Sequence, residues 1–257
     1  MRYVDLNCDL GESFGNYKCG MDEEVIPYIT SANVACGFHA SDPVVMQKTV
    51  KTAKEHQVCV GAHPGYQDLV GFGRRNMVLQ PAEITAIVQY QIGALSAFCT
   101  AAGITLQHVK PHGALYNMAV KDEKIAAAIC EGIASIDQQL ILLGPAHSQL
   151  VAAAEKCGLP TANEVFADRA YEEDGTLVAR SKPGAVITDR DTAIARVIQM
   201  VKKGTVTAIT GKEIEVEADS ICVHGDSPAA LEFVRSIHAA LQAEGIGLAP
   251  MKKVISA

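Results

Sequence analysis

The sequence predicts an α/β fold in which seven parallel strands and their connecting helices form one (β/α) barrel domain over residues 1–257. The first observation is that short β-rich runs alternate with longer helical patterns along the chain. The second is the length of 257 residues, which suits a barrel of this kind as a single domain. The third is one short polar β-hairpin that breaks the alternation, which we interpret as a small insertion.

The predicted strands are short and apolar, as expected for parallel strands that are covered on both faces. They are Tyr3–Cys8, Asn33–Cys36, Val58–Gly61, Thr105–Lys110, Leu140–Leu143, Thr161–Phe166 and Ser220–His224. Such strands close into a barrel or form an open sheet. Both arrangements place ligands beyond the carboxyl ends of the strands.

The predicted helices between these strands carry end signals. Asp42 is a predicted N-cap followed by Pro43, and Gly103 is the predicted C-cap of a helix that Gln80 opens. Three further helices end at a glycine: Ala146–Cys157, Asp189–Lys203, and a helix from Ser227 to the residue before Gly245.

The inserted hairpin lies between the last two predicted barrel strands. Thr205–Ala208 and Glu213–Glu217 are short β-like runs on either side of the turn residues Thr210–Lys212. No linker, repeat or charge block divides the chain, so we expect a single domain.

Composition excludes several classes of protein. The net charge of −7 argues against a nucleic-acid partner, because such proteins need a basic face that neutralises phosphates. No apolar run approaches the roughly 18 residues that span a bilayer, and Asp5 lies where a signal peptide would be apolar. The 8 cysteines include no C-x-x-C pair, so we expect reduced thiols and no structural zinc site. We therefore expect a cytoplasmic protein without a membrane partner.

Polar residues follow six of the seven predicted strands. A single such residue is more often a cap or a turn residue, but the ends of parallel strands converge on one concave face. We therefore predict an active site there. Its candidate residues, in chain order, are Asn7, Asp9, Glu12, His39, His63, Lys110, His112, Asp168, Arg169, His224 and Asp226.

Other local patterns in the sequence give weaker evidence about the site. The basic loop Gly71–Arg75 contains Arg74, which could hold a carboxylate or phosphate, although a solvated loop is an equal alternative. A divalent metal on Asp9, His39 and His63 is geometrically allowed. Because the chain has no metal-ligand spacing signature, we assign no residue to a metal. The chain also lacks a P-loop, a G-x-G-x-x-G motif, H-E-x-x-H and G-x-S-x-G.

Six motifs in order resemble the LamB/YcsF family. They are Asp5–Glu12, Ala32–Pro43, Gly61–Asp68, Val109–Asn117, Phe166–Arg180 and Val223–Asp226. The resemblance covers nearly the whole chain. It implies a barrel like that of carbohydrate deacetylases.

The resemblance also implies an activity, the ATP-dependent opening of 5-oxo-L-proline (pyroglutamate) to L-glutamate. The resemblance further implies two separately encoded partner subunits, B and C, and ATP with Mg²⁺ acting through the complex. Partner subunits that bind ATP would explain why this chain has no nucleotide motif.

Lactam hydrolysis needs an activated carbonyl, a deprotonated water and a proton for the leaving nitrogen. We hypothesise that Asp9 or His224 is the general base, and that Lys110 and His112 stabilise the oxyanion or protonate nitrogen. Arg169 would bind a carboxylate or phosphate, while Asp168 and Asp226 would orient these cations.

The remaining candidates, Asn7, Glu12, His39, His63 and Arg74, are predicted to bind substrate. Two alternatives stay open, a stand-alone metal-dependent deacetylase or amidohydrolase and a non-catalytic substrate-binding subunit.

Overall fold

The barrel of this chain is closed by seven parallel strands, as the sequence predicts. The computed structural model describes residues 2–224 and 228–256. The strands are β1 (Tyr3–Leu10), β2 (Ser31–Ala35), β3 (Cys59–His63), β4 (Leu106–Val109), β5 (Ile141–Gly144), β6 (Thr161–Phe166) and β9 (Ser220–Val223). They pair in this order, and β9 pairs with both β6 and β1, which closes the ring.

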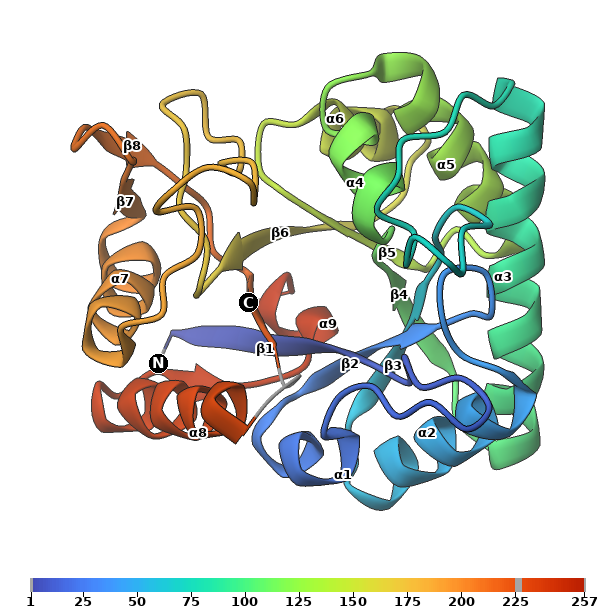
Figure 1. The fold of residues 1–257 in the computed structure, drawn as a ribbon, viewed down its shortest axis with the longest axis horizontal. Helices are drawn as coiled ribbons and strands as arrows, with labels where there is room; N and C mark the ends of the chain where they lie inside the picture. The colour runs from blue at the N-terminus through green and yellow to red at the C-terminus, as the bar shows by residue number, and fades with distance from the viewer. Residues whose placement is uncertain (1, 225–227, 257) are drawn as a thin grey trace.

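Helices surround the strands on the outside of the ring (Figure 1). The longer ones are α2 (Pro43–Glu55), α3 (Pro81–Ala102), α5 (Glu123–Ile136), α7 (Arg190–Lys203) and α8 (Pro228–Ala243). The shorter ones are α1 (Asp22–Val25), the 3-10 helix η1 (Ile26–Tyr28), α4 (Gly113–Ala119), α6 (Gln149–Lys156) and α9 (Met251–Val254). The main apolar core lies between these helices and the outward side chains of the strands, such as Leu6, Val34 and Val60.

The predicted helix ends are confirmed at three places. The Asp42 side chain accepts from the N–H groups of Val44 and Val45, and Gly103 and Gly204 have left-handed φ values of 71° and 67°. The helix predicted from Ala146 instead begins at Gln149. His147 has a φ of 61°, which interrupts a right-handed helix, and the Ser148 side chain caps the helix by accepting from Val151 N–H.

The predicted inserted hairpin is confirmed. Strands β7 (Thr205–Thr207) and β8 (Glu213–Glu215) pair antiparallel in a separate sheet, which projects at the upper left of Figure 1. This hairpin follows α7 and precedes β9. It therefore lies outside the barrel wall.

The amino end of the barrel contains two elements that the sequence analysis did not predict. The short strand β10 (Gly247–Leu248) pairs with Tyr3 and Val4 at the start of β1. In α9, Met251 packs with Ile141, Leu143 and Ala162 of β5 and β6. This end of the barrel is thus closed by apolar contacts from the last part of the chain.

The barrel interior along β1, β2 and β9 is polar. Asp5 accepts hydrogen bonds from the hydroxyls of Ser31 (2.6 Å) and Ser220, and Asn7 Nδ2 donates to Ser220 Oγ (2.7 Å). One layer higher, Asn33 Nδ2 donates to Asn7 Oδ1 (2.8 Å) and to Asp9 Oδ1 (2.8 Å). Hydrogen bonds therefore run from the amino end to the carboxyl end of the barrel.

A histidine fills the space beside this ladder. His108 Nε2 donates to Asn33 Oδ1 (2.7 Å), and burial lowers the pKa of His108 to about 3, so its ring is neutral. A Cβ at Gly61 would lie 2.1 Å from His108 Nε2. Gly61 is therefore the residue that lets His108 enter the barrel. The His108 side chain is fully buried in the core.

Helix α3 modifies one expectation. Its 22 residues are long and apolar enough to cross a membrane by length and composition alone, although the sequence analysis expected no stretch of this kind. In the structure α3 packs against α5, with Ile84, Val88 and Ile92 fully buried. The buried stripe identifies α3 as a helix of the outer layer.

Candidate active site

A cavity of about 770 Å³ opens at the carboxyl ends of the barrel strands. This volume lies in the usual range for small-molecule sites. Eight of the predicted residues line the cavity: Asp9, Glu12, His63, Arg74, Lys110, His112, Arg169 and His224. The barrel therefore brings together side chains that follow β1, β3, β4, β6 and β9.

Lys110 is the buried cation at the base of this cavity. Its Nζ lies 3.0 Å from Asp9 Oδ1 and 2.9 Å from Glu164 Oε1, and it donates to Cys222 Sγ at 3.2 Å. Burial alone would lower the pKa of Lys110, but the charges of Asp9 and Glu164 outweigh burial and hold the pKa well above its usual value. Lys110 is therefore an ammonium ion that carboxylates neutralise.

Asp9 connects Lys110 to the histidines. Burial alone would raise the pKa of Asp9, but the neighbouring His63 and the Lys110 ammonium outweigh burial and hold the pKa well below its usual value. Its second oxygen, Oδ2, lies 3.4 Å from His63 Nε2. Asp9 is thus an anion shared between two parts of the site.

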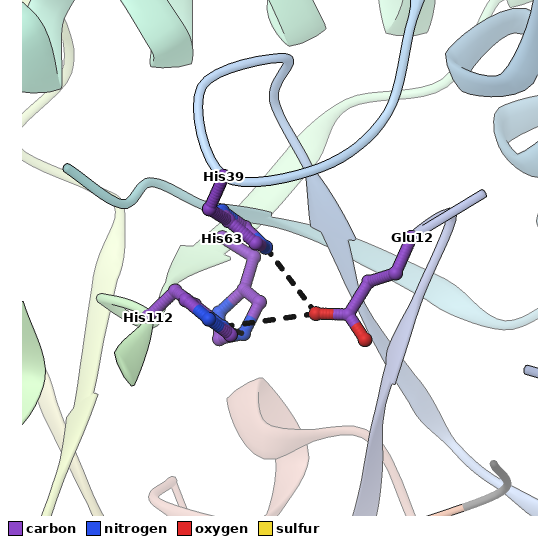
Figure 2. A group of neighbouring side chains, drawn as sticks. All are labelled: Glu12, His39, His63 and His112. Carbon is purple, nitrogen blue, oxygen red and sulfur yellow. Dashed lines mark hydrogen bonds and ion pairs between the residues drawn. The ribbon is translucent and has the colours of Figure 1, made fainter. Parts of the chain in front are cut away.

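Glu12, His39, His63 and His112 form a compact group that we call the histidine cluster (Figure 2). Their nearest ligand atoms all lie within 4.8 Å of one another. The rings of His39 and His112 stack with centroids 3.7 Å apart and planes inclined by 4°. Glu12 Oε1 lies 3.2 Å from His39 Nε2 and 3.7 Å from His112 Nδ1. Burial lowers the pKa values of His39 and His112 well below normal, so both rings are neutral.

The loop that carries Arg74 holds this cluster from one side. His112 Nε2 donates to the carbonyl oxygen of Phe72 (2.8 Å), and Ala114 N–H donates to that of Gly73 (2.9 Å). A Cβ at Gly113 would lie 2.6 Å from Gly73 O, so the close approach of the two backbones requires glycine. Arg74 stacks on Phe72, while Arg75 pairs with Asp68.

On the opposite side of the cavity, His224 pairs with Asp168. His224 Nδ1 lies 2.9 Å from Asp168 Oδ2. Burial would lower the pKa of His224, but the charge and hydrogen bond of Asp168 outweigh burial and raise it. A histidine that faces a cavity with a carboxylate behind it has the arrangement of an oriented general base.

The sequence matches the LamB/YcsF family over residues 4–256. The chain belongs to this family. Among curated relatives, the A subunit of 5-oxoprolinase from Clostridium beijerinckii is 63% identical over 254 residues, 99% of this chain and 100% of the relative. The corresponding 5-oxoprolinase protein of Pyrococcus abyssi is 59% identical over 252 residues, 98% of this chain and 99% of the relative.

Two solved structures share the fold of this LamB/YcsF chain. The lactam utilization protein of Thermus thermophilus superposes with a TM-score of 0.92 and 46% identity, covering 96% of this chain and 99% of that one. A deacetylase solved with its substrate superposes with a TM-score of 0.50 and 12% identity, covering 99% of this chain and 91% of that one. The second likeness concerns the fold alone and agrees with the predicted deacetylase-like barrel.

Three of the residues predicted for this LamB/YcsF site lie behind the cavity wall, and one cannot be placed. Asn7 and His39 are fully buried and contact the lining residues Lys110 and His112, and Asp168 reaches the cavity through His224. Asp226 lies outside the described residues.

Arg169 lines the cavity, but part of its guanidinium group is engaged by the backbone. Its Nη2 donates to Val178 O (2.6 Å), and its Nε donates to Ala185 O (3.4 Å). The remaining N–H groups are those that can contact a bound anion.

The sequence analysis missed two members of the site in this LamB/YcsF chain, Glu164 and Tyr116. Tyr116 OH donates to Glu164 Oε2 (2.7 Å), and the other oxygen of Glu164 pairs with Lys110. A glutamate inside the otherwise apolar strand Thr161–Phe166 was a usable signal, because a charge there needs a buried partner.

Proposed function

We propose that this chain is a subunit of an ATP-dependent 5-oxoprolinase. The complex would hydrolyse the lactam of 5-oxo-L-proline to L-glutamate, with ATP hydrolysed to ADP and phosphate. The names of the relatives support this assignment, since two are named as 5-oxoprolinase subunits and the Thermus protein is called a lactam utilization protein. The observation that carries it is the cavity where the buried Lys110 ammonium faces the oriented His224.

His224 is the general base of this proposal. Its ring lies on the cavity wall, and Asp168 holds Nδ1 at 2.9 Å, which leaves Nε2 for a water molecule. Asp9 is the weaker candidate for this role, since its neighbours His63 and Lys110 hold its pKa well below the usual value and make it a poorly basic anion. We assign Asp9 to the positioning of Lys110.

Lys110 stabilises the negative charge that develops on the lactam oxygen. Its ammonium group is already held at the cavity base by Asp9 and Glu164, so little reorganisation is needed when charge forms. The His112 ring is neutral and its Nε2 proton is donated to Phe72 O, so the proton for the leaving ring nitrogen comes from His224 once it has deprotonated water. Arg74, which is exposed on the cavity wall, and the remaining N–H groups of Arg169 bind the substrate carboxylate or a phosphate.

ATP enters this proposal through partner proteins, the B and C subunits of 5-oxoprolinase, in the cytoplasm. The chain has no P-loop, and the curated relatives are named as one component of a multi-subunit enzyme, which supports an assembly. Transfer of the γ-phosphoryl group from ATP to the lactam oxygen releases ADP and activates the carbonyl. Attack by water and cleavage of the C–N bond then give γ-glutamyl phosphate, and a second water hydrolyses this acyl phosphate to glutamate and phosphate.

The test is reconstitution of the chain with its candidate partner subunits, followed by glutamate release from 5-oxo-L-proline with and without ATP and Mg²⁺. We expect turnover only with ATP and all subunits. His224→Asn should lower turnover at least about 100-fold, because it removes the base. The matched control is His56→Asn, since His56 is exposed and precedes β3 at the other end of the barrel.

Two other functions give different results in this assay. A stand-alone deacetylase or amidohydrolase is favoured by the histidine cluster and would act on an amide without ATP or partners. A substrate-binding subunit without catalytic residues would assemble and bind 5-oxo-L-proline, and His224→Asn would leave turnover near that of the wild type. Either outcome would replace the proposed function.

A further inference from the structure

The histidine cluster contains two ring nitrogens that face each other, and in neutral rings no proton lies between them. His63 Nδ1 lies 2.7 Å from the carbonyl oxygen of Lys110, and His112 Nε2 lies 2.8 Å from that of Phe72. A carbonyl oxygen accepts hydrogen bonds and cannot donate, so each of these outer nitrogens carries its ring's proton. In neutral rings, His63 Nε2 and His112 Nδ1 are therefore both lone-pair acceptors.

These two acceptors lie 2.9 Å apart in a buried position. Two lone pairs at this distance repel each other unless a positive charge lies between them. The charge is either an additional proton on one ring or a bound cation. The surroundings of the two nitrogens distinguish these cases.

Carboxylate oxygens face the same position. Glu12 Oε1 lies 3.7 Å from His112 Nδ1, and Asp9 Oδ2 lies 3.4 Å from His63 Nε2. Among the described residues, no amide or hydroxyl group donates a hydrogen bond to Glu12 Oε1, His112 Nδ1, Asp9 Oδ2 or His63 Nε2. Two imidazole nitrogens and the Glu12 carboxylate, which belong to a group of ligand atoms within 4.8 Å of one another, form a donor set for a divalent ion.

His39 completes the arrangement as a positioning residue. Its Nε2 lies 3.2 Å from Glu12 Oε1, so it donates to the carboxylate, while the buried Nδ1 has no partner within the described part of the chain. The stacking of His39 on His112 fixes the plane of that ring. Partners that orient ligands in this way are usual around protein metal sites.

We propose that the histidine cluster binds one divalent transition-metal ion through His63 Nε2, His112 Nδ1 and the Glu12 carboxylate. Imidazole nitrogens favour Zn²⁺ and its neighbours over Mg²⁺ or Ca²⁺, which take oxygen ligands. Glu12, His63 and His112 all line the cavity, so a coordination position faces the space where a substrate would lie. Bound there, such an ion supplies Lewis-acid polarisation of a carbonyl oxygen.

The experiment measures metal binding by the full-length chain after chelator treatment. Zn²⁺ is titrated calorimetrically, and Co²⁺ is followed by its visible absorption, which reports the ligand geometry. We expect one ion per chain and a higher Tm in the presence of Zn²⁺, because the ion binds the folded state.

Ligand variants test the assignment of atoms. His63→Ala, His112→Ala and Glu12→Gln should each weaken Zn²⁺ binding at least about tenfold and change the Co²⁺ spectrum. His112→Gln provides a second variant that keeps more side-chain volume, and circular dichroism confirms folding. His39→Gln should weaken binding less than removal of a ligand. The control is His56→Ala, which should bind like the wild type.

Two results would overturn the proposal. One is a folded wild-type chain that binds less than one ion at micromolar Zn²⁺, with nitrogen NMR showing a proton shared by His63 and His112. The other is unchanged affinity in the folded His63 and His112 variants. Neither measurement uses turnover, so a failure of the metal site is distinguishable from a failure of the 5-oxoprolinase assignment.

Discussion

Around the mouth of the barrel, the half that follows β1 to β4 differs from the half that follows β6 and β9. In the first half the polar side chains contact one another directly, as His39 stacks on His112 and Lys110 pairs with Asp9. In the second half a long loop between Phe166 and α7 intervenes, and Arg169 is directed at the backbone of that loop. The first half is a network of side chains in direct contact. The second half contains the pair of His224 and Asp168 beside a long loop.

The two halves of the site are held in place by different parts of the fold. In the first half, the side chains are positioned by the ends of barrel strands and by close backbone contacts that require glycine. The geometry of this half is therefore fixed by the barrel. The second half has a small core of its own, made of Ala170, Val178 and Ala185. Ligand-binding loops are usually the less stable parts of a fold. We therefore expect substitutions in the first half to affect global stability and those in the second to act locally.

The largest effect is expected for Lys110→Met. Removal of the ammonium leaves Asp9 and Glu164 buried without their cation, which costs about 3 to 5 kcal/mol of unfolding free energy. Glutamate release by the reconstituted complex should fall about 1000-fold. Denaturant unfolding and the turnover assay check both values, with the exposed Lys51→Met as control. A stable Lys110→Met chain with normal turnover would remove Lys110 from the site.

Asp5→Asn tests the polar ladder beneath both halves. Burial raises the pKa of Asp5 to about 6. Between about pH 4 and pH 6 the unfolded chain loses this proton while the folded chain keeps it, so the group lowers stability as pH rises. The asparagine variant should lack this slope, gaining about 3 kcal/mol relative to wild type between pH 4 and pH 7. Urea unfolding across this range checks the prediction, and parallel pH profiles for the two chains would contradict it.

Asp168→Asn tests the pair of His224 and Asp168 in the second half. The charge of Asp168 raises the pKa of His224, so its removal should lower that pKa. A general base acts when neutral, and the acid limb of the activity profile should therefore move to lower pH. Turnover at neutral pH should fall about tenfold because the ring loses its orientation. Asp137→Asn, at an exposed residue before β5, is the control, and an unmoved acid limb would argue against His224 as the base.

The smallest effect is expected for Arg169→Met. Loss of the bonds to Val178 O and Ala185 O should destabilise the loop by about 1 to 3 kcal/mol. Hydrogen exchange should accelerate at the amides of Ala170 and Val178, which bond across the loop. The amide of His112, bonded to Pro64 O in the first half, should keep its protection. Equal acceleration in both halves would show that they are one cooperative unit.

Most of the fold could be predicted from the sequence because its signals are local. Apolar runs, the Asp42 cap and Gly103 locate strands and helices within a few residues. Strand β10 was missed because two residues show no periodicity and their pairing with Tyr3 and Val4 is not local. The late start of α6 depends on the backbone angle of His147, which its residue type does not indicate.

The candidate site was predictable in membership but not in contacts. The rule that strand ends converge brought Asp9, His63, Lys110 and His224 to one cavity. It could not show that His39 lies behind His112, because stacking depends on loop geometry. Glu164 was missed because it lies in the middle of strand β6, whereas the predicted residues lie near or beyond the carboxyl ends of their strands.

The closure of the barrel has a consequence for its synthesis. The hydrogen bond between Ser220 and Asp5 joins positions 215 residues apart. During translation, β1 emerges from the ribosome well before its neighbours β9 and β10, and contacts so distant along the chain form slowly. In the nascent chain, one edge of β1 therefore stays unpaired until β9 and β10 are made. The acidic and amide side chains of β1 keep this unpaired strand more soluble than aliphatic side chains would.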